Sequence, residues 1–324
     1  MSKLLSITEY VNGITSGNIS VLSKAITLIE SRKQEHQELA SQLIETILPF
    51  SGKSMRIGIT GVPGVGKSTF IDAFGIHLIN EHKKVAVLAI DPSSSISKGS
   101  ILGDKTRMEN LSVHPKAFIR PTASGGSLGG VTYKTKETIL LCEAAGFDSI
   151  IVETVGVGQS ETEVNSITDF FLLLMLTGAG DELQGIKRGI MEMADGIVIT
   201  KADGNNINKA KSARAEFANA LHFFPPSESG WIPEVKTCSA IEKKGMEDVL
   251  TMIDKYHRHT LTNGFFHEKR KNQNLISFQK LLDEQLKKQF LSSQQIKNQI
   301  TELNQKVEQG IISPYGAVKS INWL

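Results

Sequence analysis

The feature that most constrains the fold is a nonapeptide at residues 61–69, Gly-Val-Pro-Gly-Val-Gly-Lys-Ser-Thr. It follows a short apolar run, MRIGIT, and opens a segment of helical character, STFIDAFGIHLINEH. A strand, a glycine-rich turn and a helix in this order match G-x-x-x-x-G-K-[ST], a pattern whose backbone N–H groups surround phosphate oxygens. The sequence therefore predicts a nucleotide-binding α/β domain. Its expected phosphate loop consists of Gly61, Val62, Pro63, Gly64, Val65, Gly66, Lys67, Ser68 and Thr69.

Further short apolar runs follow, separated by segments long enough to be helices. The runs VAVLAI, SIIVET, FFLLLML, GIVIT and EVKTCS are apolar nearly throughout, as expected for parallel strands covered on both faces. Between them, KTKETILLCEAAG and INKAKSARAEFANALHF are long enough for right-handed crossovers. We therefore expect an α/β P-loop NTPase domain, doubly wound around a mainly parallel sheet, over residues 53–260.

Helical patterns flank this domain on both sides. Residues 1–52 contain VLSKAITLIES and QEHQELASQLIETIL before Pro49 and Gly52 end the pattern, which predicts an N-terminal helical extension. After Tyr256 the strand patterns end, and the Gln- and Lys-rich residues 274–310 resemble two amphipathic helices. Residues 261–324 are therefore expected to form a C-terminal helical arm, which either mediates a homodimer or folds back on its own domain.

The net charge and the cysteine content indicate which partners and which cellular compartment to expect for this protein. The chain has 36 Lys and Arg against 34 Asp and Glu, a net charge of +2, so no nucleic-acid or membrane partner is expected. No apolar run approaches the length of a membrane-spanning helix, and the N-terminus is expected to belong to the mature fold. Cys142 and Cys238 form no CxxC pair, which argues against a disulfide framework and favours a cytoplasmic location.

Two further observations indicate the ligand. Lys67 is expected to reach the β and γ phosphates, and the Ser68 hydroxyl to bind Mg²⁺. The segment Thr200-Lys201-Ala202-Asp203 follows the run GIVI, and the carboxylate of Asp203 can accept hydrogen bonds from guanine N1–H and the exocyclic amine. Adenine would leave this carboxylate unpaired. Together with Cys238-Ser239-Ala240 after the next strand, this pattern predicts GTP and GDP as ligands.

Carboxylates end two of the predicted strands. Glu153 ends the buried part of SIIVET and precedes a glycine turn, a position suited to an acid that holds a water of Mg²⁺. The amide of Gly156 can then bind the γ-phosphate and release it on hydrolysis. Asp91 ends VAVLAI, and Asp104 lies in GSILGDKTRM. Either can support Mg²⁺ or orient water, and the alternative for each is a helix cap or a solvated turn.

Several long motifs, in order, resemble one family. The segments GVPGVGKST, AIDPSSSISKGSILGDKTRM, IVETVGVGQSE and the basic GIKRG are similar to those of the MeaB/ArgK family of methylmalonyl-CoA mutase-associated GTPases, over nearly the whole chain. The resemblance implies that switch I contains Asp91 and Asp104 and that switch II runs from Glu153 to Gln159. It also implies an extra switch over residues 178–188 that relays nucleotide state to the mutase.

The resulting assignments are as follows. The expected metal ligands are Ser68, Asp91, Asp104 and Glu153, and the expected catalytic residues are Lys67, Asp104 and Glu153. Besides the phosphate loop, the residues expected to bind the nucleotide are Gly156, Lys201, Asp203, Ser239, Ala240 and Ile241. The resemblance implies that the relay to a partner involves Gln159, Asp181, Glu182, Lys187 and Arg188.

Two positions depart from related patterns. The family has Asn where this chain has Thr200, before Lys201 and Asp203. Signal-recognition GTPases resemble this TKxD form, so guanine binding is retained, while the packing that Asn provides against the phosphate loop is left open. Gln159 lies two residues beyond the water-orienting Gln of Ras-like proteins and is not assigned that role.

The resemblance implies a magnesium-dependent GTPase that acts as a chaperone and regulator of an adenosylcobalamin-dependent acyl-CoA mutase, gating its cofactor loading and protecting or reactivating it. An adenosyltransferase is a further candidate partner, and the chain does not identify the client. One alternative is a nickel-insertion GTPase, although the eight histidines are scattered and His257 and His259 form an isolated pair. Another is a kinase of a transport-related protein, although the chain lacks the sequence motifs of protein kinases.

Overall fold

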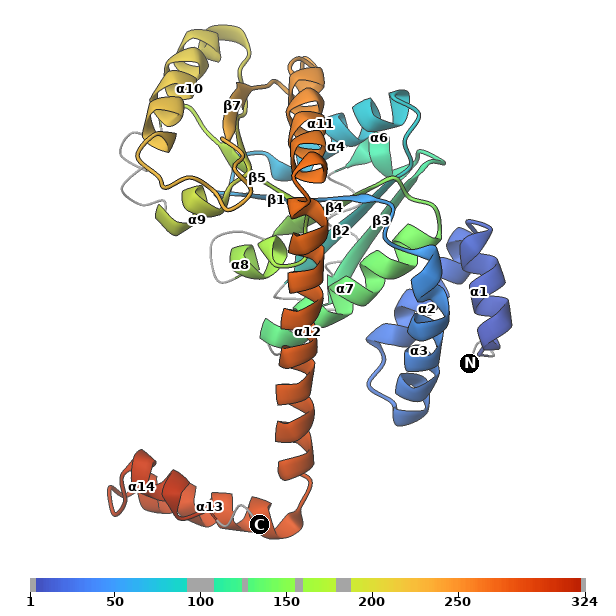
Figure 1. The fold of residues 1–324 in the computed structure, drawn as a ribbon, viewed down its shortest axis with the longest axis vertical. Coiled ribbons are helices and arrows are strands. Elements are labelled where there is room, and N and C mark those ends of the chain that lie inside the picture. The colour runs from blue at the N-terminus through green and yellow to red at the C-terminus, as the bar shows by residue number, and fades with distance from the viewer. Residues whose placement is uncertain (1–3, 92–107, 124–127, 155–159, 179–187, 322–324) are drawn as a thin grey trace. The chain divides into compact units, whose positions relative to one another are not determined.

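The protein is organised around one parallel sheet of seven strands in the order β3-β2-β4-β1-β5-β6-β7 (Figure 1). The structure is a computed structural model and describes residues 4–91, 108–123, 128–154, 160–178 and 188–321. All neighbouring strands of this sheet pair in parallel, as expected for crossover connections. The strands are β1 (Met55–Gly61), β2 (Val85–Asp91), β3 (Ala117–Ala123), β4 (Ser149–Thr154), β5 (Phe170–Met175), β6 (Gly196–Ile199) and β7 (Glu234–Thr237).

The strand β3 is the one that the sequence patterns do not predict. Its sequence, AFIRPTA, interrupts the apolar texture with Arg120 and Pro121. Proline lacks a backbone N–H, so it is confined in sheets to edge strands, strand starts and bulges. Because β3 pairs with β2 alone and forms one edge of the sheet, Pro121 is compatible with this position.

Helices cover both faces of the sheet, which confirms the predicted doubly wound architecture. Successive residues of one strand enter different cores: Ile150 and Val152 belong to one apolar cluster, and Ile151 belongs to the other. The helices between strands are α4 (Lys67–Asn80), α6 (Glu109–Ser112), α7 (Leu128–Ala144), α8 (Ser160–Asn165), α9 (Arg188–Met193) and α10 (Ile207–Leu221), and α11 (Met246–Thr262) follows the last strand. Burial on both faces explains why the strands are apolar throughout instead of alternating.

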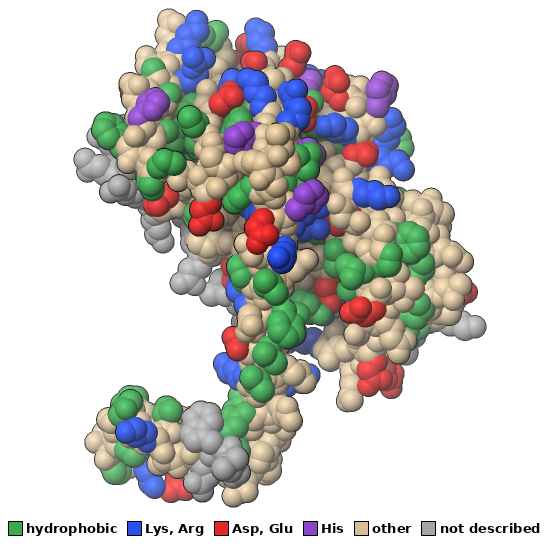
Figure 2. Space-filling model, viewed as in Figure 1, with side chains coloured by type: hydrophobic (Ala, Val, Ile, Leu, Met, Phe, Trp, Pro, Cys, Tyr) green, Lys and Arg blue, Asp and Glu red, His purple; other side chains and the backbone are tan. Residues whose placement is uncertain are grey.

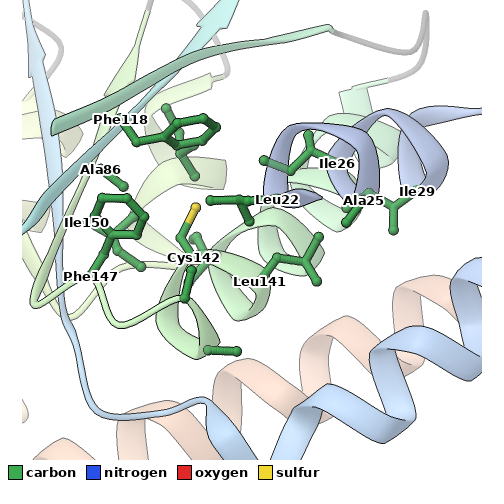
Figure 3. Packing of buried hydrophobic residues seen from close by; sticks show 14 of the residues in the cluster. Leu22, Ala25, Ile26, Ile29, Ala86, Phe118, Leu141, Cys142, Phe147 and Ile150 are labelled. Carbon is green, nitrogen blue, oxygen red and sulfur yellow. The ribbon is translucent and has the colours of Figure 1, made fainter. Parts of the chain in front are cut away.

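The N-terminal segment forms three helices, α1 (Ile7–Thr15), α2 (Ile19–Glu30) and α3 (Gln34–Ile47). A capping box between Ser6 and Glu9 starts α1. Figure 3 shows that Leu22 and Ile26 of α2 point toward Cys142 of α7, and all three belong to the cluster on that face of the sheet. The helical extension therefore packs onto the nucleotide domain through a shared apolar core.

The chain divides into two compact units, Met1–Lys271 and Asn272–Leu324. The helix α12 (Phe265–Phe290) begins in the first unit and continues into the second, which also contains α13 (Gln294–Glu308) and α14 (Pro314–Lys319). Figure 2 shows hydrophobic side chains exposed along α12. In the second unit these are Leu275, Ile276, Phe278, Leu282 and Leu286, each between 41% and 59% exposed.

The first turns of α12 are fixed to the first unit by charge. Arg270 forms a bidentate ion pair with the buried Asp169, with nitrogen–oxygen distances of 2.8 and 2.6 Å. Arg270 also donates to the carbonyls of Gly52 and Ser54, both at 2.6 Å. Asp169 directly precedes β5, so this network holds the first turns of α12, which belong to the first unit, at the amino-terminal ends of the strands.

The two cysteines are both buried. Burial raises the pKa of the Cys142 thiol, and burial together with the charge of Asp203 raises the pKa of Cys238 to about 12. Among the residues described here, no helix combines the length and hydrophobicity needed to cross a membrane.

A buried ion pair joins β1 to α7, and we predict that breaking it destabilises the fold. Arg56 contacts Glu143 at 2.9 and 3.0 Å, and Glu143 also accepts from the amide of Gly52 at 2.8 Å. Glu143→Ala leaves the guanidinium buried without this partner and should cost about 3–5 kcal/mol of unfolding free energy, measured by urea denaturation. As a control, Glu302→Ala removes the exposed ion pair with Lys306 and should have little effect. A similar loss in both variants would contradict the prediction.

Candidate functional site

Most of the predicted nucleotide-site residues that the structure describes lie where the carboxyl ends of neighbouring strands meet. In the parallel register Ile59 of β1 is paired with Glu153 of β4, and Gly61 is paired with Leu174 of β5. On the next strand, Val198 of β6 is paired with Leu174. Because all these strands run in the same direction, the loops that follow them emerge at one edge of the sheet. This edge carries the phosphate loop and the segment at residues 200–203.

The phosphate loop connects β1 to α4 and depends on two glycines. A Cβ atom on Gly61 would lie 2.6 Å from the carbonyl oxygen of Leu174, so a side chain does not fit between β1 and β5. Gly66 precedes the helix with φ 92°, a left-handed conformation that favours glycine. The first amides of α4 are therefore free of side-chain capping and point toward the loop, as required for an anion site.

Lys67 lies in the first turn of α4, and its ammonium group faces the loop. Its Nζ donates to the carbonyl of Gly61 at 2.8 Å. Burial lowers the pKa of Lys67, while the negative charges of Glu153 and Glu161 act in the opposite direction. The cation is thus bonded to a carbonyl of the loop and is influenced by the charges of two carboxylates, and from the loop it can contact phosphate oxygens.

Ser68 and Glu153 come together at the expected metal position. The Ser68 hydroxyl donates to Oε1 of Glu153 at 3.3 Å, although the two residues are 85 positions apart in the sequence. Glu153 is 7% exposed. Hard oxygen donors converging at the start of a phosphate-loop helix suit Mg²⁺, which prefers few protein ligands together with water and phosphate oxygens. The donor set therefore fits the metal that the motif implies.

The segment Thr200-Lys201-Ala202-Asp203 is tied directly to the phosphate loop. The hydroxyl of Thr200 donates to the carbonyl of Val65 at 2.8 Å and is 3.2 Å from the carbonyl of Met175. The Nζ of Lys201 donates to the carbonyl of Gly64 at 2.9 Å. The threonine at this position thus provides the attachment to the phosphate loop that was left open when Thr200 was compared with Asn.

The carboxylate of Asp203 is oriented by the loop after β7. The Ser239 hydroxyl donates to Oδ2 of Asp203 at 2.6 Å, and the amide of Glu242 donates to the same Ser239 oxygen at 3.1 Å. The amide of Ala202 donates to the carbonyl of Cys238 at 2.9 Å, which joins the two segments through their backbones. Asp203 is half-buried, so part of its side chain remains accessible to a ligand.

Other predicted residues are placed less fully. Ala240 is half-buried beside this loop, and Ile241 is 80% exposed. Asp91 ends β2 at the same edge as Glu153, and Arg188 begins α9, but the structure describes only their backbones. The remaining predicted residues lie outside the described residues: Asp104, Gly156, Gln159, Asp181, Glu182 and Lys187.

Three residues of this region are not predicted from the sequence. Glu161, in the first turn of α8, is 2% exposed and contributes to the electrostatics of Lys67. Its only sequence signal is an acidic residue in a first helical turn, which usually reflects the helix dipole. Asn206 and Thr177 form a hydrogen-bonded contact beside Lys201, and polar residues in loops carry no sequence signal for such a contact.

The histidines show no metal-binding arrangement within the described ranges. No group of three or more His, Cys, Asp or Glu side chains that could hold a metal ion occurs among these residues. His257 is half-buried and contacts the ring of Phe266, with a centroid distance of 4.8 Å. His259 is exposed and lies 3.0 Å from the carbonyl of Ser229.

Comparisons with known proteins agree with this geometry. The model of the family described as methylmalonyl-CoA mutase-associated GTPase MeaB matches residues 22–295. The GTPase ArgK of Escherichia coli strain K12 is 42% identical over 317 residues, covering 98% of this chain and 96% of that protein. The mitochondrial methylmalonic aciduria type A homolog of Mus musculus is 42% identical over 312 residues, covering 93% of this chain and 75% of that protein.

A solved structure shows the same fold along the whole chain. The crystal structure of LAO/AO transport system kinase matches with a TM-score of 0.78 and 36% identity, covering 98% of this chain and 97% of that one. The matched family, the relatives named as GTPases and the shared fold lead to one conclusion. The chain belongs to the methylmalonyl-CoA mutase-associated GTPase family MeaB, and it is a GTPase with the P-loop fold.

Proposed function

We propose that this GTPase uses Mg²⁺ and acts as a chaperone of an adenosylcobalamin-dependent acyl-CoA mutase of the methylmalonyl-CoA mutase type. The nucleotide state would gate cofactor loading and the protection or reactivation of the mutase. The family description, which names association with this mutase, is the observation that carries the proposal. The name of the mouse relative, which refers to methylmalonic aciduria, supports the same metabolic context.

The phosphate side of the site would work by positioning and charge. The phosphate loop would hold the β and γ phosphates through backbone amides, and Lys67 would neutralise charge that develops as the terminal phosphate leaves. Ser68 and Glu153 would hold Mg²⁺, directly or through water, with Asp91 and Asp104 nearby; the metal supplies charge neutralisation to the phosphates. The contact between Ser68 and Glu153 supports this assignment.

The base side of the site would select guanine through Asp203. A carboxylate accepts hydrogen bonds from guanine N1–H and from its exocyclic amine, and the bond from Ser239 keeps the carboxylate oriented. Adenine presents an acceptor at N1, so it would face Asp203 without a compensating hydrogen bond. Lys201, Ala240 and Ile241 would flank the base or its ribose.

We predict that Asp203→Asn changes the base preference. An amide presents one donor and one acceptor where the carboxylate presents acceptors only, so the variant should favour xanthine over guanine. Calorimetry with GTP and XTP should show that the affinity ratio reverses relative to the wild type. An unchanged ratio would contradict the assignment of Asp203 to the base.

The relay to the mutase would involve the extra switch at residues 178–188. The segment contains three glycines, at positions 178, 180 and 185, and Gly189 directly follows it. These glycines would allow the backbone to rearrange, and the charges of the segment can form different ion pairs in different nucleotide states. Asp181, Glu182, Lys187 and Arg188 would be the relay residues, together with Gln159 of switch II.

We predict that Lys187→Ala uncouples the GTPase from its client. Basal GTP affinity should stay within about a few-fold of the wild type because the residue is outside the phosphate loop, but stimulation of hydrolysis by the mutase should be lost. Phosphate release is measured for both proteins with and without the mutase. The exposed Lys24 of α2, changed to Ala, provides a control for removal of a surface charge. Full stimulation of Lys187→Ala would exclude a role in the relay.

The second unit would mediate a homodimer. Leu275, Phe278, Leu282 and Leu286 follow a spacing of three and four residues, which places them on one face of α12. These side chains are 41–59% exposed in the single chain, so the face is available for an apolar partner. A second copy of the chain offers the same surface, which is the arrangement of a twofold dimer.

We predict that Leu282→Glu converts the dimer into a monomer, since a carboxylate on this face cannot be buried without a partner. Light scattering measures the mass, and Phe223→Glu, at a side chain that is 83% exposed after α10, serves as the control. A chain truncated after Lys271 should also be monomeric, and it keeps the bonds that Arg270 makes to Asp169. A dimer mass for both Leu282→Glu and the truncated chain would remove the arm from the interface.

A further inference from the structure

Asn206 occupies a junction between two parts of the site. It ends the short helix η3 (Gly204–Asn206), directly after the base segment. Its Nδ2 donates to the carbonyl of Lys201 at 2.7 Å, and its backbone amide donates to the carbonyl of Asp203 at 2.9 Å. Its Oδ1 accepts from the hydroxyl of Thr177 at 2.9 Å. Asn206 is thus hydrogen-bonded to Lys201 and Asp203 of the base segment and to Thr177, which follows β5.

The backbone of the base segment requires such support. Lys201 has φ 56°, a left-handed conformation that costs free energy in a residue other than glycine and persists only where its surroundings hold it. The side chain of Lys201 is held on one side by the carbonyl of Gly64, and its carbonyl is held on the other side by Asn206. The backbone at Asp203 is extended, with φ −132° and ψ 168°, so the chain changes conformation between these two residues.

The side chain at position 206 needs both functions of an amide. The carbonyl of Lys201 requires a donor, and the hydroxyl of Thr177 is satisfied by an acceptor. Asparagine offers both from one planar group, whereas aspartate offers acceptors only and alanine offers neither. Thr177 follows β5 and precedes Gly178, where the proposed extra switch begins.

We propose that Asn206 is a positioning residue for guanine selectivity, which holds the backbone of Lys201 and Asp203 so that the carboxylate meets both hydrogen-bond donors of the base. The proposal rests on the assignment of Asp203 to guanine in the proposed function. Thr177 supports the same geometry from β5 through its hydrogen bond to the Asn206 amide. Neither Asn206 nor Thr177 has to touch the nucleotide for this role.

The test compares GTP with ITP, because inosine retains N1–H but lacks the exocyclic amine of guanine. In the wild type Asp203 makes two hydrogen bonds to guanine and one to hypoxanthine, so GTP should bind more tightly. Asn206→Ala displaces the carboxylate, and the ratio of GTP to ITP affinity should fall by about fivefold to tenfold, the value of about one hydrogen bond. Both affinities are measured by calorimetry on the full-length protein.

Two further variants separate positioning from general stability. Thr177→Val keeps the shape of the side chain but removes the donor to Asn206, so the GTP-to-ITP ratio should fall by a smaller factor in the same direction. Thr177→Ser keeps the hydroxyl and should retain the wild-type ratio. Because Asn206 and Thr177 act through one contact, the double variant Asn206→Ala/Thr177→Val should lose no more selectivity than Asn206→Ala alone.

Asn219→Ala is the matched control, since it makes the same change at an exposed position of α10 and should leave the ratio unchanged. Thermal unfolding shows whether each variant is folded. If Asn206→Ala lowers the affinities for GTP and ITP by the same factor, Asn206 stabilises the loop without affecting selectivity, and the proposal is overturned. If the wild type binds ITP as tightly as GTP, the assignment of Asp203 to guanine is wrong. The wild-type ratio therefore separates failure of that assignment from failure of the role proposed for Asn206.

Discussion

The site depends on the position of β1 between β4 and β5 in a sheet whose strands all run in the same direction. This arrangement brings together the carboxyl ends of strands that are distant in the sequence. Helices cover both faces of the sheet, and ligands of such folds bind beyond these carboxyl ends. Gly61 shows how close this packing is, because the carbonyl of Leu174 leaves no room for a Cβ atom. The buried strands β1 and β5 therefore fix where the phosphate loop begins.

Beyond the carboxyl ends of the strands, the phosphate and base segments form one hydrogen-bonded unit. Thr200 and Val65, which are 135 positions apart in the sequence, are joined by a hydroxyl–carbonyl bond of 2.8 Å. A hydroxyl has a single proton, so the contact of Thr200 with Val65 limits what it can donate to Met175. Lys201 adds a second bond to the loop at Gly64. A displacement of the loop after β6 would therefore also strain the phosphate loop.

Much of this could be predicted because local sequence patterns reflect local physics. Continuous apolar runs predicted the buried strands, and the segment after the glycine-rich turn predicted a helix from Ser68, which in the structure begins at Lys67. The strand β3 could not be predicted, since Arg120 and Pro121 are acceptable only on a sheet edge, which is a property of the assembled sheet. The partners of Asp203 and Asn206 were also missed, because hydrogen bonds between loops depend on tertiary distances that spacing along the chain does not contain.

The burial of both cysteines has a practical consequence. The thiolate is the form that reacts with alkylating reagents, and the raised pKa values keep Cys142 and Cys238 protonated at neutral pH inside a packed interior. A cysteine introduced at an exposed position would therefore react first, without prior removal of the native residues. Fluorescent or spin labels can in this way be attached to each of the two units in the native sequence background, which makes the distance between them accessible to spectroscopy in each nucleotide state.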